Sequence, residues 1–311
     1  MQTNISSETH YLVGVSTVAA DTSELAHILI AALDDTDGQA EPSTLRILSG
    51  DQSPIACEIA FIPSKNTLSQ LSNALASFDG DWAALPASGR KKKLLICDMD
   101  STIIAEECLD ELADFAGLKT EISAITERAM AGELNFEEAL TTRVGMLKGL
   151  PLSAISKCYQ ERIHLNLGAK TLVATMQAHG ANCQLVSGGF TDFTSRVAAA
   201  AGFTSHHANT LINDGNSLTG DVGMPILGRE AKLDCLKAAA ADHNVGLDAA
   251  LCMGDGANDL AMIEAAGLGI AYRAKPIVAA QADAAINHSD LTAALFFQGY
   301  AREEFVTPTE G

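Results

Sequence analysis

Hydrophobic and polar positions follow two different patterns, which divide the chain near residue 90. The first part contains three β-branched, strand-like runs, at 10–18, 44–50 and 55–63. It also contains two segments with apolar residues at helical spacing, at 23–33 and 67–78. The order β-α-β-β-α predicts a small α+β domain of ferredoxin type over residues 1–80.

Beyond this domain the pattern becomes that of an α/β protein. Continuous apolar runs, as expected for strands buried on both faces, occur at 93–98, 182–189, 250–256, 268–272 and 283–288. Helical patterns separate most of them, at 169–180, 191–202, 229–243 and 258–267. We therefore predict a doubly wound, mostly parallel sheet over residues 93–300, followed by a C-terminal tail at 301–311.

Three segments interrupt these patterns. Residues 81–92, which contain Pro, Gly and Ser before the basic run "RKKK", predict a linker whose basic residues are solvated. Residues 105–168 predict a mostly helical cap inserted after the first strand of the sheet. Residues 206–222 predict a hairpin around Asp214-Gly215.

Composition narrows the class of protein. Hydrophobic residues make up 47% of the 311 residues and charged residues 19%, which indicates a folded globular protein. A formal net charge of −19 argues against a nucleic-acid partner. We find no secretory signal and no run long enough to span a bilayer. Seven scattered cysteines without a C-x-x-C pair favour reduced thiols, a cytoplasmic location and no zinc site.

Polar residues gather where the predicted strands end. They are Asp98 and Asp100 in "DMDST", Ser187 in "SGG", and Asp255, Asn258 and Asp259 in "GDGAND". Since ligands bind at the carboxyl ends of parallel strands, we expect these side chains to meet at one edge. Four carboxylates in one pocket need a cation, and oxygen ligands of this kind suit Mg²⁺. An EF-hand is excluded because Ile103 and Leu109 occupy its Gly and Glu positions, and "GDGAND" lacks the G-K-[ST] ending of a Walker loop.

The order of these motifs resembles that of the haloacid dehalogenase superfamily. The matching residues are D-x-D-x-T at Asp98, Asp100 and Thr102, then Ser187, Lys232, and G-D-x-x-x-D at 254–259. Within the superfamily the segments "DMDSTIIAEECLDELA", "GELNFEEALTTRV" and "VSGGF" are most similar to those of phosphoserine phosphatases. The resemblance covers residues 93–300 and implies a haloacid dehalogenase-like fold with a helical cap.

The resemblance also implies a mechanism with Mg²⁺ as cofactor. Asp98 would be the nucleophile and form an aspartyl-phosphate, and Asp100 would be the general acid and base. Mg²⁺ would be held by Asp98, the main-chain carbonyl of Asp100 and Asp255, with Asp259 orienting its waters. The phosphate would be bound by the remaining matching residues, Lys232, Ser187, Gly188, Gly189 and Asn258.

By the same resemblance, the cap carries specificity for O-phospho-L-serine. Glu107 would bind the ammonium and Arg143 the carboxylate, while Met130 and Phe136 would wall the site and exclude water. Two alternatives remain open within the enzyme class: a phosphotransferase, and a phosphatase for another small amine or amino-acid phosphate. A third alternative is a non-catalytic amino-acid sensor.

The order of elements over residues 1–80 loosely resembles the ACT family of amino-acid-sensing domains. The loop "AADTSEL" lacks the glycine that this family commonly uses to approach its ligand. We therefore expect this domain to serve as an interface, with a homodimer as the assembly.

Overall fold

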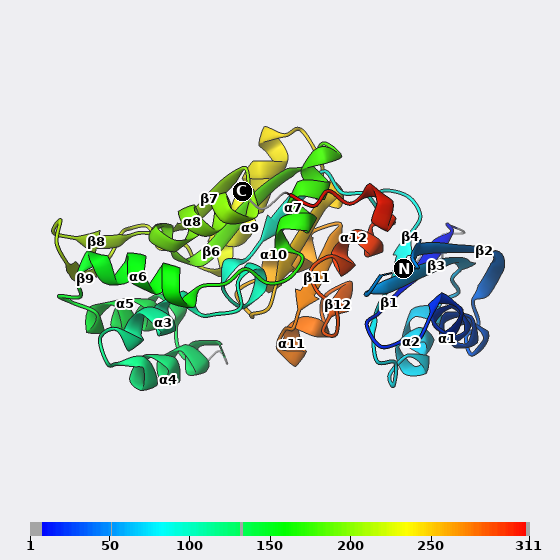
Figure 1. Cartoon of the computed structure of the whole chain (residues 1–311), viewed down its shortest axis with the longest axis horizontal. Helices are drawn as coiled ribbons and strands as arrows, with labels where there is room; N and C mark the ends of the chain where they lie inside the picture. Colours follow the sequence, from blue (N-terminus) through cyan, green and yellow to red (C-terminus); the bar gives the residue numbers. More distant parts are fainter. Residues whose placement is uncertain (1–7, 51, 131–132, 309–311) are drawn as a thin grey trace.

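The computed structural model describes residues 8–50, 52–130 and 133–308. It consists of an N-terminal domain, an α/β core and a helical lid, with the first and the last at opposite ends of the molecule (Figure 1). Within the described residues, no helix is both long and apolar enough to cross a membrane. All seven cysteines of the chain lie in the described part, and none forms a disulfide.

The N-terminal domain is an antiparallel sheet with two helices on one face. Its strands are β1 (His10–Ser16), β2 (Gln39–Ser49), β3 (Ile55–Ile62) and β4 (Asp81–Pro86), in the order β2-β3-β1-β4. Its helices are α1 (Thr22–Asp34) and α2 (Thr67–Ala74). Leu12 packs toward these helices, whereas Val13 and Val15 contribute to the core cluster on the opposite face. The predicted α+β ferredoxin-like domain is confirmed.

The core is a six-stranded sheet in the order β12-β11-β10-β5-β6-β7, with every neighbouring pair parallel. The strands are β5 (Leu94–Cys97), β6 (Asn182–Phe190), β7 (Ser205–Asn209), β10 (Ala250–Gly254), β11 (Leu268–Tyr272) and β12 (Ala284–Ile286). The helices beside them are α7 (Ala169–Ala178), α8 (Thr191–Ala201), α9 (Arg229–Asp242), α10 (Leu260–Ala265), α11 (Pro276–Ala279) and α12 (Ala293–Phe297). Short 3₁₀ turns lie at Leu247–Ala249 and Arg302–Glu304.

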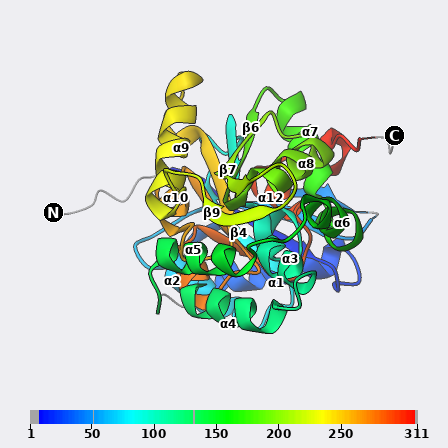
Figure 2. The same cartoon turned by 90° about the vertical axis from the view of Figure 1, so that its left-hand side faces the viewer.

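Apolar residues on both faces of β5 explain why helices cover both sides of the sheet. Leu95 and Cys97 belong to the core cluster that includes residues of α7, α8 and α12. Leu94 and Ile96 belong to a second cluster with residues of α9 and α10. Figure 2 shows α9 and α10 on one side of the sheet and α7 and α8 on the other. The predicted doubly wound, parallel sheet is confirmed.

Four helices form the lid: α3 (Cys108–Asp114), α4 (Lys119–Met130), α5 (Phe136–Met146) and α6 (Leu152–Arg162). They follow β5 after a tight turn at Met99–Ile103, in which Ser101 has a φ of 54°. A two-stranded hairpin of β8 (Leu211–Asn213) and β9 (Leu218–Val222) lies against the lid. The predicted hairpin segment, 206–222, starts too early, because residues 205–209 form the polar edge strand β7 of the main sheet.

The predicted linker, residues 81–92, is also wrong in part. Its first six residues form β4, which closes the N-terminal sheet beside β1. Two residues of its basic run are engaged: the Arg90 side chain is only 8% exposed and pairs with Glu58 of the N-terminal domain at 2.8 Å. Lys92 is buried and donates to the carbonyl of Asp248 in the core. The predicted solvated flank therefore does not hold for Arg90 and Lys92.

The C-terminal segment packs onto the protein rather than trailing from it. Arg302 donates to the Ser49 hydroxyl and the Pro54 carbonyl of the N-terminal domain. The Phe305 ring lies 4.9 Å from that of Phe296 in α12. The predicted tail at 301–311 thus contributes to the domain interface over its described part, residues 301–308.

Candidate active site

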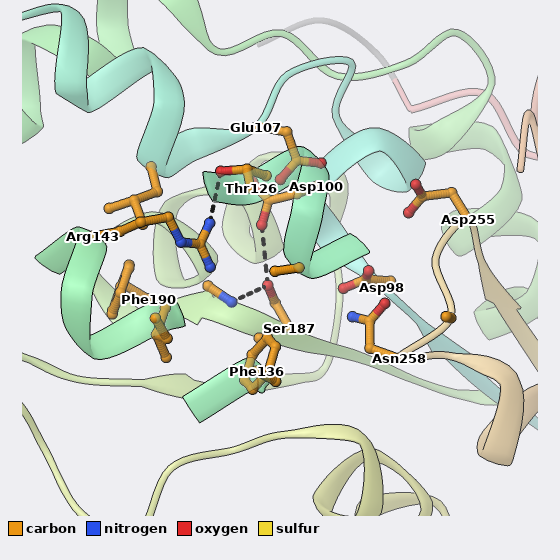
Figure 3. Close-up of a pocket in the computed structure, with 16 residues that line it drawn as sticks. Asp98, Asp100, Glu107, Thr126, Phe136, Arg143, Ser187, Phe190, Asp255 and Asn258 are labelled. Atoms are coloured by element: carbon orange, nitrogen blue, oxygen red, sulfur yellow. Dashed lines mark hydrogen bonds between the residues drawn. The ribbon is translucent and has the colours of Figure 1, made fainter. Parts of the chain in front are cut away.

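The polar residues at the strand ends surround one cavity of about 230 Å³. Asp98 follows the last residue of β5, Asp255 follows the last residue of β10, and Ser187 lies near the end of β6. The lid contributes the remaining wall, through Glu107 and residues of α4 and α5. Figure 3 shows Asp98, Asp255 and Asn258 at one end of the cavity and Arg143 at the other.

Three buried carboxylates cluster at the first end. Asp98, Asp255 and Asp259 each offer an oxygen that lies within 4.8 Å of the others. The Lys232 ammonium lies 2.8 Å from Asp98 Oδ1 and 2.6 Å from Asp259 Oδ1. Lys232 is fully buried, and burial by itself would lower its pKa. The charges of Asp259 and Asp98 outweigh this effect and raise the pKa above its ordinary value, so Lys232 stays protonated.

One lysine does not balance three acids. Burial, followed by repulsion from Asp259, raises the pKa of Asp255 from 3.8 to about 7. The same two causes raise the pKa of Asp98 well above its ordinary value. A divalent cation would remove this repulsion, so the cluster fits one.

The hydrogen bonds indicate which of these acids could bind such a cation. Both oxygens of Asp259 are engaged, Oδ1 by Lys232 and Oδ2 by the amide of Gly256 at 3.1 Å. Asp98 uses Oδ1 for Lys232 and for the amide of Met99, whereas no residue in the described part of the chain donates to its Oδ2. No other described residue donates a hydrogen bond to the Asp255 carboxylate. Asp98 and Asp255 are therefore the acids with free oxygens.

Asp100 lies between the acidic cluster and the lid. Its Oδ1 accepts from the amide of Cys108 at 2.8 Å. Its Oδ2 accepts from the Ser187 hydroxyl at 3.3 Å, the bond drawn in Figure 3. Burial raises the pKa of Asp100, against the lowering effect of these hydrogen bonds. The side chain is thus suited to hold a proton and to exchange it with a group in the cavity.

The two glycines after Ser187, at the end of β6, leave little room for a side chain. A Cβ on Gly189 would lie 2.9 Å from Asp100 Oδ2, and a Cβ on Gly188 would lie 3.1 Å from the Phe136 ring. The amide of Gly189 donates to the Ser187 hydroxyl at 2.8 Å, so it is already engaged in this structure. The glycines bring the backbone close to Asp100 and to the lid.

The lid places one acidic and one basic side chain along the cavity, Glu107 near Asp100 and Arg143 at the far end (Figure 3). The left-handed turn at Ser101 brings its hydroxyl to 2.7 Å from Glu107 Oε1. Burial, followed by repulsion from Asp100, raises the pKa of Glu107 from 4.5 to about 8. Arg143 on α5 is 7% exposed, and burial lowers its pKa.

Most of the residues predicted from the sequence therefore line the cavity. Those that line it are Asp98, Asp100, Glu107, Phe136, Arg143, Ser187, Gly188, Gly189, Asp255 and Asn258. Lys232 and Asp259 lie behind Asp98 instead. Met130 ends α4, and its side chain is outside the described part of the chain.

Sequence reasoning missed two polar residues. Thr126 lines the cavity from α4 and accepts a hydrogen bond from Arg143. In "AITERAM" it lies three residues before Ala129, which also lines the cavity, and this helical spacing could have suggested it. Asn209 is buried at the end of β7; its amide donates to the carbonyl of Gly188 at 2.8 Å, and its oxygen accepts from the amide of Leu227. No sequence pattern points to Asn209, because its partners come from distant segments.

A model of the haloacid dehalogenase-like hydrolase family matches residues 95–264, which is more than half of the chain and includes the acidic cluster. The chain belongs to this family. Among its relatives, the phosphoserine phosphatase of Streptococcus thermophilus is 48% identical over 200 residues, covering 64% of this chain and 93% of that protein. The phosphoserine phosphatase of Streptomyces coelicolor is 42% identical over 216 residues, which cover 69% of this chain but only 52% of that protein.

Solved structures of this family share the fold. A hydrolase of the family from Salmonella enterica serovar Typhi aligns with a TM-score of 0.82 and 30% identity, over 93% of this chain and 98% of that one. Such coverage extends into the N-terminal domain. A substrate-bound phosphoserine phosphatase complex aligns with a TM-score of 0.64 and 38% identity, over 67% of this chain and 98% of that one.

Proposed function

We propose that the protein hydrolyses O-phospho-L-serine to L-serine and phosphate, with Mg²⁺ and through an aspartyl-phosphate on Asp98. The observation that carries this proposal is the polarity of the cavity. Its two ends match the two ends of the substrate: an acidic cluster suited to a cation and a phosphate, and a lid with Glu107 and Arg143 suited to an ammonium and a carboxylate.

Asp98 would supply the nucleophile. Its Oδ2 is free while Oδ1 is fixed by Lys232 and the amide of Met99, so one oxygen is held and the other can attack phosphorus. Mg²⁺ would be held by Asp98, the main-chain carbonyl of Asp100 and Asp255. When bound, it would neutralise charge on the phosphoryl oxygens and among the acids.

Asp100 would move the protons. With its raised pKa it can protonate the serine oxygen as that oxygen leaves, and can then take a proton from the hydrolytic water. Lys232 would keep Asp98 ionised, and Asp259 would hold Lys232. Ser187, the amide of Gly188 and Asn258 would hydrogen-bond the phosphoryl oxygens.

The lid would select the amino acid. Glu107 would bind the ammonium and Arg143 the carboxylate, and Phe136 would wall the site and exclude water. An alcohol phosphate without an amino-acid group would leave both charged side chains without partners, which weakens its binding.

The test is phosphate release from phosphoserine, with and without EDTA, by the wild-type protein and by Asp98→Asn. We expect release that EDTA abolishes and Mg²⁺ restores, and no release by the variant. Hydrolysis of other phosphomonoesters but not of phosphoserine would reject the substrate; release that persists in EDTA would reject the role of the metal.

Such a reaction would supply serine and would be the last step of its biosynthesis. It would take place in the cytoplasm, where seven free cysteines remain reduced.

We also propose a homodimer through the N-terminal domain. Its strand β2 lies at the sheet edge, with Leu45 38% and Ile47 54% exposed. Light scattering after size exclusion would give the mass: twice 32.5 kDa supports the dimer, and a monomer rejects it.

A further inference from the structure

A chain of polar side chains crosses three helices of the lid. Asp110 lies on α3, Thr126 on α4 and Arg143 on α5. The Thr126 hydroxyl donates to Asp110 Oδ1 at 2.7 Å, and Arg143 Nη1 donates to that hydroxyl at 2.9 Å. All three residues are buried, with exposed fractions of 9%, 5% and 7%. Figure 3 shows the bond between Arg143 and Thr126 at the lid end of the cavity.

The number of protons on Thr126 fixes the direction of the hydrogen bonds among these three side chains. A threonine hydroxyl has one proton, and two acceptors lie near that of Thr126: Asp110 Oδ1 at 2.7 Å and the Ile122 carbonyl at 3.1 Å. The shorter contact, to a carboxylate, takes the proton. The oxygen of Thr126 is then left with lone pairs, which accept from the guanidinium. Replacing the hydroxyl by a methyl group would break both bonds at once.

Asp110, linked to Arg143 through Thr126, also supplies the counter-charge of this arginine. Among the residues that the structure describes, no carboxylate lies within 4.0 Å of this guanidinium. A buried cation without a partner is costly. Asp110 is the first of the charges that raise the pKa of Arg143 against the lowering effect of burial. Asp110 thus acts on Arg143 across Thr126, without touching it.

The geometry leaves donors for a ligand. A guanidinium has five N–H groups. In Arg143 one of them, on Nε, donates to the carbonyl of Ala139 at 3.2 Å, and one on Nη1 donates to Thr126. The other three have no partner among the described residues, and Arg143 lines the cavity. The side chain is therefore held by two bonds with its remaining donors available to an anion.

We infer that Thr126 and Asp110 are positioning residues that aim Arg143 at the substrate carboxylate, and that they set the preference for phosphoserine over the same ester without its carboxylate. This inference rests on the proposed function. Neither residue would take part in phosphoryl transfer, since Thr126 lines the lid side of the cavity and Asp110 contacts Thr126 without lining the cavity. Their loss should weaken recognition of one substrate group rather than slow the chemistry.

The experiment compares phosphoserine with phosphoethanolamine, which has the phosphate and the ammonium but no carboxylate. KM and kcat would be measured on both for the wild type, Thr126→Val, Thr126→Ser and Asp110→Asn. Thr142→Val is the matched control: Thr142 precedes Arg143 in α5, but it is exposed and its hydroxyl donates to the Glu138 carbonyl at 2.7 Å, not to Asp110.

We expect Thr126→Val to lower the kcat/KM ratio of phosphoserine to phosphoethanolamine about tenfold or more, mainly through the KM of phosphoserine, as loss of a hydrogen bond to a charged group implies. Thr126→Ser should restore most of the ratio, because the hydroxyl is what matters. Asp110→Asn, which removes the charge but keeps an acceptor, should give a smaller loss of the same kind. Thr142→Val should leave the ratio as in the wild type.

The outcomes for the two proposals are separate. A wild-type protein that does not hydrolyse phosphoserine rejects the proposed function, whatever the variants do. A wild type that prefers phosphoserine, combined with a Thr126→Val protein that keeps this preference or loses both substrates equally, overturns the inference alone. If Thr126→Val does not fold, an unchanged ratio in Asp110→Asn overturns it.

Discussion

The two acids after β5, Asp98 and Asp100, differ in the hydrogen-bond partners of their carboxylate oxygens. Asp98 and Asp100 are two positions apart, yet Asp98 is held by a lysine and Asp100 by the Cys108 amide and the Ser187 hydroxyl. This difference suits one acid for attack and the other for proton transfer.

The assignment predicts different defects for two matched substitutions. Asp98→Asn should abolish both turnover and formation of the phosphoenzyme. Asp100→Asn should slow formation and hydrolysis of the phosphoenzyme each by about 10²–10⁴-fold, because one group serves as acid and then as base. Rapid-quench measurement of both steps is the check, and a defect confined to one step would mean that a second residue transfers the other proton.

Glu107 has a pH-dependent effect on stability that can be tested without substrate. Its pKa is about 8 in the folded protein, against an ordinary value of 4.5. Between pH 4.5 and pH 8 the folded protein keeps the proton on Glu107 while the unfolded protein loses it, so stability falls as the pH rises. The loss is complete above pH 8 and absent below pH 4.5. Glu107→Gln should therefore raise the free energy of unfolding in EDTA by roughly 1–3 kcal/mol at pH 8.5, since each pKa unit corresponds to about 1.4 kcal/mol and the cavity partly hydrates the side chain.

The gain should shrink as the pH falls and vanish near pH 4.5. Urea unfolding of both proteins across this range measures it, and the acids that do not interact with Glu107 cancel in the difference. A constant gain at every pH would show that the effect comes from packing rather than from titration of Glu107.

Among the elements, the hairpin β8–β9 fixes the base of the lid. The amide of Gly149 donates to the carbonyl of Leu218 at 2.8 Å, and the amide of Leu218 donates to the carbonyl of Leu150 at 2.9 Å. These bonds join the lid, between α5 and α6, to a segment that belongs to the core in sequence. The hairpin thus supports the helix that carries Arg143.

Two glycines in this hairpin make a matched pair. Gly215 and Gly220 have φ values of 93° and 87°, so alanine is strained at both by about 1–2 kcal/mol. A Cβ at Gly215 meets nothing within 4 Å, whereas one at Gly220 would lie 3.0 Å from Lys148 Cβ in the lid. We expect Gly220→Ala to lose more stability than Gly215→Ala and to raise the KM for phosphoserine, measured by thermal unfolding and steady-state kinetics. Equal effects would mean that the hairpin does not position the lid.

The whole molecule is held together by an interface between the N-terminal sheet and the core. Asp81 of β4 is buried and accepts hydrogen bonds from the amides of Asn287, His288 and Ser289, at 2.7, 3.1 and 2.7 Å. Val13 and Val15 of β1 join the same apolar cluster as α12. The two domains therefore share part of one core.

Loss of Asp81 should weaken the whole protein. Asp81→Ala leaves three amides without their acceptor, and we expect a loss of about 2–4 kcal/mol in the free energy of unfolding. Asp79→Ala is the control, because the exposed Asp79 carboxylate pairs with His288 at 2.9 Å and with no other described residue, and its loss should cost less than about 1 kcal/mol. Equal losses in chemical denaturation would show that the three amides are solvated and the interface is loose.

The sequence by itself determined the parts of this protein that depend on local pattern and motif order. Continuous apolar runs identified the buried strands, and the acids at their ends identified the edge where Asp98, Asp100 and Asp255 meet, because parallel strands bring their carboxyl ends together. The edge strands β4 and β7 were instead predicted as part of a linker and part of a hairpin. A strand that is paired on one side only needs no continuous apolar run, so the pattern did not assign them to the sheets.

Only the tertiary structure decided how the side chains are partnered. That Lys232 lies behind Asp98, that Arg90 pairs with Glu58, and that Thr126 connects Asp110 to Arg143 depend on residues distant in sequence. A hydrogen bond is set by distance and angle within a fraction of an ångström, and residue type and spacing carry no such information across separate helices. The sequence therefore determined where the polar strand-end residues gather, and packing of the lid on the core decided which group each charge faces.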